Sequence, residues 1–107
     1  MTLTQFAMIV IGPGYDPVLH RAFIPSPAFS TTVVCVSSLE QAVQVAQALV
    51  RQGIQLIELC GGFLPEQAAF LHESVDRQIP VGVVRYSPEE QQQLSRLFGE
   101  SASSSSA

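Results

Sequence analysis

Three residues have side chains that could act as an acid, a base or a nucleophile beside predicted strands: Glu58, Cys60 and His20. Cys60 precedes a predicted helix N-terminus, which favours the thiolate and hence a nucleophilic or redox role. Glu58 could serve as a general base and His20 as an acid or base near neutral pH. The alternatives are structural: a small buried side chain for Cys60 and an exposed helical position for His20. The sequence does not decide whether the protein is an enzyme.

Arg85 is the expected partner of Glu58. A carboxylate on a strand that is buried on both faces needs a partner, and Arg85 lies near the end of the neighbouring predicted strand. Such a pair could be structural. Alternatively, Arg85 could bind the carboxylate or phosphate of a ligand through two parallel hydrogen bonds.

Two glycine turns could hold an anion. Gly61 and Gly62 end the apolar stretch 54–59, and Pro65 fits the first position of a following helix. Backbone N–H groups at a helix N-terminus bind anions, although tight turns also need glycine without any ligand. The predicted ligand site combines both turns with nearby side chains: Gly12, Gly14, Gly61, Gly62, Phe63, Arg85 and Tyr86. No metal-ligand spacing is present, and we expect no cofactor.

Strands and helices alternate in the predicted order. Strands are expected over 5–11, 31–36, 54–59 and 81–86, and helices over 16–23, 39–50, 65–77 and 88–98. This order predicts a single small α/β domain over residues 1–99, in three layers around a four-stranded, mainly parallel (βα)4 sheet. A flavodoxin-like strand order, 2-1-3-4, would bring the two glycine turns together. A ferredoxin-like α+β fold is the alternative, and residues 100–107 are predicted to be a disordered serine-rich tail.

Two of the predicted helices have clear apolar stripes. In the helix 39–50, apolar residues recur at helical spacing, a serine capping box precedes it and Gly53 closes it. The helix 88–98 is expected to bury Leu94, Leu97 and Phe98.

The composition limits the possible partners. Of 107 residues, 47% are hydrophobic and only 13% charged, with a net charge of −4 and no lysine. The absence of a basic cluster argues against nucleic-acid binding. No apolar run is long enough to span a membrane, and no signal peptide is evident, so we expect a cytoplasmic protein. Few charges indicate either an apolar surface that contacts another subunit or a buried parallel sheet.

Two blocks carry a resemblance to a known family. Glu58-Leu59-Cys60-Gly61-Gly62-Phe63 and Ile79-Pro80-Val81-Gly82-Val83-Val84-Arg85-Tyr86 resemble a family of small bacterial proteins of unknown function. The similarity runs from about Phe6 to Tyr86 and includes Gly12-Pro13-Gly14, Asp16 and His20-Arg21. It implies a stand-alone α/β domain and transfers no catalytic residue.

Two functions remain open. The first is binding of a small anionic metabolite, bearing phosphate or carboxylate, at the carboxyl edge of the sheet. The second is a non-enzymatic homo-oligomeric module for regulation or protein interaction, which the charge-poor composition favours. In either case we expect a homodimer or a higher homo-oligomer.

Overall fold

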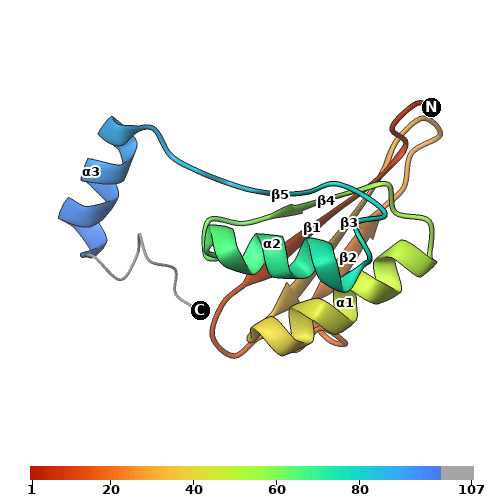
Figure 1. The fold of residues 1–107 in the computed structure, drawn as a ribbon, viewed down its shortest axis with the longest axis horizontal. Coiled ribbons are helices and arrows are strands. Elements are labelled where there is room, and N and C mark those ends of the chain that lie inside the picture. Colours follow the sequence, from red (N-terminus) through yellow and green to blue (C-terminus); the bar gives the residue numbers. More distant parts are fainter. Residues whose placement is uncertain (100–107) are drawn as a thin grey trace.

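The computed structural model describes residues 1–99; the predicted serine-rich tail lies outside the described residues. Figure 1 shows the elements, which alternate less regularly than expected. In chain order they are β1 (Gln5–Ile11), β2 (Arg21–Ile24), β3 (Ser30–Val36), α1 (Leu39–Arg51), β4 (Leu56–Leu59), α2 (Pro65–Ser74), β5 (Val81–Val83) and α3 (Pro88–Phe98).

The sheet is five-stranded and mixed, in the order β2-β3-β1-β4-β5. β1 is central and parallel to both β3 and β4, and β4 is parallel to β5. The predicted order of the four parallel strands is therefore confirmed, and the ferredoxin-like alternative is wrong. The predicted number of strands is also wrong, because β2 adds an antiparallel strand at the edge of β3.

β2 occupies part of the segment predicted as the helix 16–23. The backbone carbonyl of Asp16 accepts hydrogen bonds from the N–H groups of Leu19 and His20, which closes one helical turn. The chain then becomes extended, and Arg21–Ile24 pairs with β3. A single turn fixes several backbone angles for few hydrogen bonds, whereas aromatic and β-branched residues such as Phe23 and Ile24 favour a strand.

α1 and α2 pack side by side on one face of the sheet (Figure 1). The hydroxyl of Ser38 caps α1 by accepting a hydrogen bond from the N–H of Gln41. Alternate residues of the three central strands point toward these helices and are completely buried: Ala7, Ile9, Val34, Val36, Ile57 and Leu59. The core therefore lies between one helical layer and the sheet. The predicted three-layer arrangement is wrong, since this domain has two layers.

On the opposite side of the sheet, here called the open face, no helix of residues 1–99 is packed. In a pleated strand successive side chains point to opposite faces. The strand registers then assign these residues to the open face: Phe6, Met8, Val10, Ala22, Ile24, Thr31, Val33, Cys35, Leu56, Glu58 and Gly82. None of them is fully buried. The cause is topological: the segment between β1 and β3 forms β2 at the edge, and supplies no helix to cover this face.

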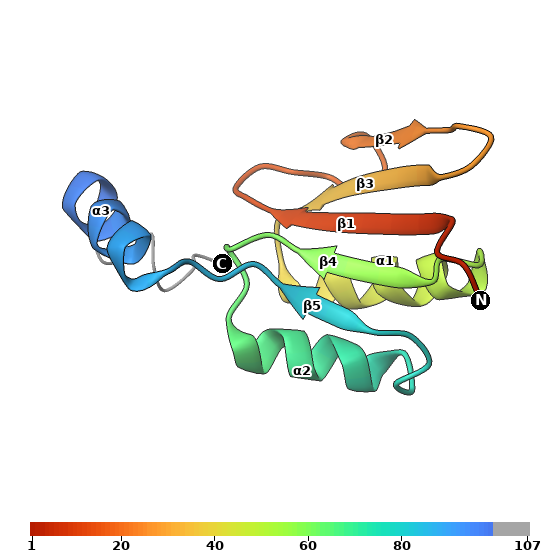
Figure 2. The same ribbon diagram turned by 90° about the horizontal axis from the view of Figure 1, so that it is seen from above.

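α3 stands apart from the sheet and from the other two helices, as both views show (Figures 1 and 2). It contributes to the long dimension of the molecule, whose extents are 41 × 26 × 25 Å. No residue of α3 is buried, and Leu97 and Phe98 are 62% and 65% exposed. The helix itself is confirmed, but the prediction that its apolar stripe is buried in the core is wrong.

Candidate functional site

The two glycine turns lie at the same edge of the sheet, because β1 and β4 are adjacent and parallel. Each turn is covered by a tyrosine of the chain itself. A side chain at Gly12 would meet the ring of Tyr15 at 2.9 Å, and one at Gly61 would meet the ring of Tyr86 at 3.1 Å. The lack of a side chain at these glycines allows the close approach of the aromatic rings, independently of any ligand.

The backbone N–H groups at the start of α2 are largely used within the chain. The N–H of Phe63 donates to the carbonyl of Cys60 at 3.2 Å, and that of Leu64 donates to the side-chain oxygen of Gln67 at 2.8 Å. Glu66 adds a negative charge in the first turn of the helix. An anion at this position would face few unused donors and a nearby carboxylate.

Arg85 is held at the same turn by backbone carbonyls. Its guanidinium donates to the carbonyl of Phe63 at 3.2 Å and to that of Val84 at 2.9 Å. No ion pair joins it to Glu58; among residues 1–99 the salt bridge present is Arg77–Glu73. Glu58 is exposed on the open face, opposite Gly82 in the neighbouring strand. It needs no charged partner because water reaches it, which removes the premise of the expected pair.

Cys60 continues the hydrogen bonding between β1 and β4 where the backbone ladder ends. Its sulfur accepts a hydrogen bond from the N–H of Ile11 at 3.3 Å, and its own N–H donates to the carbonyl of Ile9 at 3.2 Å. The thiol is half-buried and not disulfide-bonded. This geometry gives Cys60 a structural role in joining the two central strands.

His20 is exposed in the loop before β2. Its Nδ1 accepts a hydrogen bond from the N–H of Asp16 at 2.9 Å, so in the neutral ring the proton is on Nε2. The ring of Tyr15 lies 5.4 Å away, between centroids. Within residues 1–99, no hydrogen bond, ion pair or ring contact joins His20 to Glu58, Cys60 or Arg85. The structure therefore does not bring the three candidate catalytic side chains into one bonded group.

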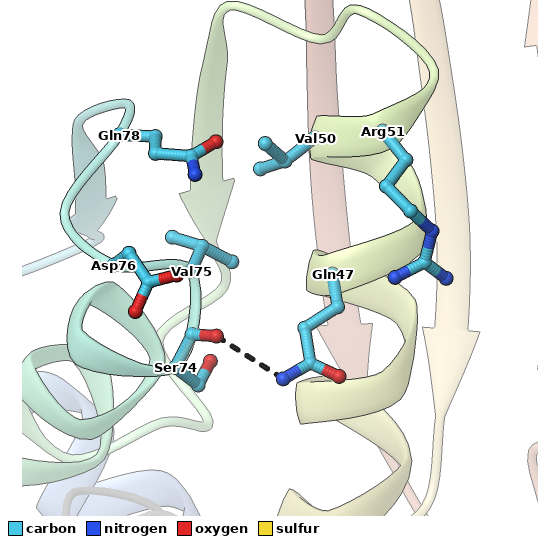
Figure 3. A pocket seen from close by; sticks show the side chains of 7 residues that line it. All are labelled: Gln47, Val50, Arg51, Ser74, Val75, Asp76 and Gln78. Carbon is cyan, nitrogen blue, oxygen red and sulfur yellow. Dashed lines mark hydrogen bonds between the residues drawn. The ribbon is translucent and has the colours of Figure 1, made fainter.

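A polar hollow of about 330 Å³ lies elsewhere, between the C-terminal ends of α1 and α2 (Figure 3). The side-chain amide of Gln47 crosses it and donates to the carbonyl of Ser74 at 3.1 Å. Asp76, on its rim, and the following Arg77 both have left-handed backbone angles, with φ of 56° and 54°. Because helices antiparallel to the strands end at the amino edge of a parallel sheet, this hollow is remote from the predicted ligand site.

With this geometry in view, the comparisons with known proteins give one match. Residues 4–99 match the model of a family of unknown function, DUF6506. The chain belongs to this family. A comparison with curated proteins finds no match, and neither does a comparison with solved structures. The predicted resemblance to a family of unknown function is confirmed, whereas the bacterial origin stays a prediction.

Two kinds of feature are absent from residues 1–99 of this DUF6506 domain. No group of three or more His, Cys, Asp or Glu side chains in this range is placed to hold a metal ion. No helix in the same range is both long enough and apolar enough to cross a lipid bilayer.

Sequence reasoning missed the open face and the exposure of the apolar stripe of α3. Apolar residues on a strand look the same whether a helix covers them or not. A usable signal was present in β4, where Glu58 interrupts an otherwise apolar strand. A carboxylate at that position indicates that its side of the sheet reaches solvent.

Proposed function

We propose that this domain is a non-enzymatic, homo-oligomeric module whose open face is its interface. One observation carries the proposal: the sheet is parallel around β1, but helices pack on only one of its faces. Parallel sheets occur almost only with both faces covered. The uncovered face presents a contiguous set of mostly apolar side chains from β1, β2, β3 and β4, the kind of surface that marks protein association.

The geometry of the carboxyl edge supports the same choice. The space beside Gly12 and Gly61 is filled by tyrosine rings, and the start of α2 is capped by Gln67. On the open face, in contrast, no helix of residues 1–99 packs against the strands. A second copy is the simplest partner, and a two-fold dimer would cover both faces by one symmetric contact.

The test is sedimentation velocity of the full chain between low and high micromolar concentration. We expect a dimer for the wild type and a monomer for Val33→Asp, which places a charge in the middle of the open face. The control is Gln44→Asp on the exposed side of α1, which should dimerise like the wild type. Circular dichroism checks that each variant is folded. A wild type that stays monomeric at high micromolar concentration would refute the proposal.

Binding of a small anion at the carboxyl edge is the second candidate. Arg85 favours it, because two carbonyl contacts hold this cation beside the Gly61-Gly62 turn. A thermal-shift experiment with inorganic phosphate and citrate tests it. A ligand at about 100 times its dissociation constant stabilises the native state by about 2.7 kcal/mol. We expect any shift of the wild type to be lost in Arg85→Gln and kept in Arg51→Gln. Equal shifts in both variants would reject the site.

A further inference from the structure

We propose that two copies of the chain exchange their C-terminal helices, so that α3 of each copy packs on the open face of the other. The inference rests on the proposed function, since it names the occupant of the same interface. In this arrangement α3 covers the face of the sheet that a crossover helix between β1 and β3 would cover.

α3 has the properties of a helix that packs on another surface. Leu94, Leu97 and Phe98 follow at helical spacing and form one apolar stripe. Together with Tyr86 they line a shallow groove along the helix. An isolated helix of 11 residues is marginal in water, because its nucleation is unfavourable and packing normally stabilises it. α3 therefore needs an apolar partner surface, and its own domain does not supply one in this arrangement.

The segment between β5 and α3 directs the helix away from its own sheet. The N–H of Val84 donates to the carbonyl of Leu59 at 3.0 Å, which prolongs the pairing with β4. Arg85 is bound to the carbonyl of Phe63, and the ring of Tyr86 lies against Gly61. Ser87 is extended, as a residue before proline tends to be. Because three successive residues are anchored at the carboxyl edge and the fourth is extended, the chain leaves in the direction of the strand.

The open face fits a single helix of this size. Eleven residues at 1.5 Å each give α3 a length of about 16 Å. The seven residues of β1 span about 23 Å at about 3.3 Å each, so α3 can lie along the strands as a crossover helix does. Gly82 leaves a hollow of about 200 Å³ beside Glu58 and Val84, which could receive a bulky side chain.

The number of exposed helices equals the number of uncovered sheet faces in each copy. Within residues 1–99, each domain has no helix on its open face and carries one helix, α3, that has no buried residue. Two copies related by a two-fold axis satisfy both needs at once and leave no unpaired helix, so the assembly closes as a dimer.

The test compares association of full-length variants. Leu97→Asp alters the stripe of α3, and we expect it to weaken dimerisation about 100-fold or more, as loss of a central apolar anchor does. Gln92→Asp, on the opposite side of α3, is the matched control and should change the dissociation constant less than about threefold. If Leu97→Asp dimerises normally while Val33→Asp does not, the exchange is wrong and the open face remains the interface.

A mixing experiment separates exchange from other uses of α3. Homodimers of either Val33→Asp or Leu97→Asp have both helix-to-face contacts damaged. A heterodimer of the two variants keeps one contact intact, between the unchanged helix of the first and the unchanged face of the second. We expect the mixture to form heterodimers more tightly than either variant forms homodimers. A mixture that remains as weakly associated as its components would overturn the exchange.

Discussion

The two faces of one sheet differ in what covers them, although the same strands supply both. On the helical face, residues such as Ile9 and Val34 are completely buried by α1 and α2. On the open face, their neighbours Met8 and Val33 are equally apolar but only half-buried. The comparison shows that an apolar side chain on a strand predicts burial against another surface. It does not predict whether that surface belongs to the same chain.

Neighbouring residues of β1 give the largest expected contrast in stability. Ile9→Ala removes a fully buried side chain and should lower the free energy of unfolding by about 2–5 kcal/mol. Met8→Ala, on the open face, should lower it by only about 1–2 kcal/mol in dilute solution, since that side chain is incompletely buried in the monomer. Urea unfolding at submicromolar concentration measures both. Equal losses would mean that the open face is covered within the monomer.

Alanine substitutions at two glycines test the same comparison, with an intermediate expected change in stability. A methyl group at Gly62 would lie 2.8 Å from a side-chain carbon of Ile11, so Gly62→Ala should destabilise the protein by about 1–3 kcal/mol. Gly82→Ala, on the open face, meets no atom within 4 Å and should stabilise it by about 0.4–1 kcal/mol, because the unfolded chain loses freedom. The midpoints of urea unfolding rank the two variants. A destabilised Gly82→Ala would show that the hollow beside it is occupied.

The N-cap residues of α1 and α3 give the smallest expected difference in the free energy of unfolding. The hydroxyl of Ser38 caps α1, which packs on the sheet, and Ser38→Ala should cost about 0.5–2 kcal/mol of global stability. Ser87 caps α3 by accepting from the N–H of Glu90 at 3.3 Å. Ser87→Ala should leave the unfolding of the dilute domain unchanged and reduce only the helical circular dichroism signal. A comparable loss of global stability in both variants would place α3 within the cooperative core.

The sequence predicted those parts of the fold that depend on local patterns. A serine cap at Ser37 or Ser38, the spacing of apolar residues and the closing Gly53 placed α1 almost to the residue, and the structure shows that Ser38 is the cap. Alternation of strands and helices yielded the order of the four parallel strands. The segment 16–23 was misassigned because Asp16 and Pro17 do begin a helical turn; only the pairing with β3 shows that the turn stops after His20.

The candidate site was less predictable, because its geometry depends on contacts distant in sequence. Nothing local indicates that Tyr86 covers Gly61 or that Arg85 binds the carbonyl of Phe63. The expected partnership of Glu58 and Arg85 assumed that β4 is buried on both faces. Whether helices pack on one face of the sheet or on both cannot be read from the sequence of a strand alone. Whether a ligand binds at the glycine turns stays a prediction.

The central position of β1 also has a consequence for synthesis of the chain. β1 is translated before both of its partner strands, since Gln5 pairs with Ser30 and Phe6 pairs with Leu56. The side chain of Gln55 also accepts hydrogen bonds from the N–H groups of Thr4 and Gln5. Pairings between distant segments slow folding, and an apolar strand is prone to aggregate until its partner strands have been synthesised. The interval between translation of β1 and of β4 is therefore when a nascent chain would most depend on chaperones.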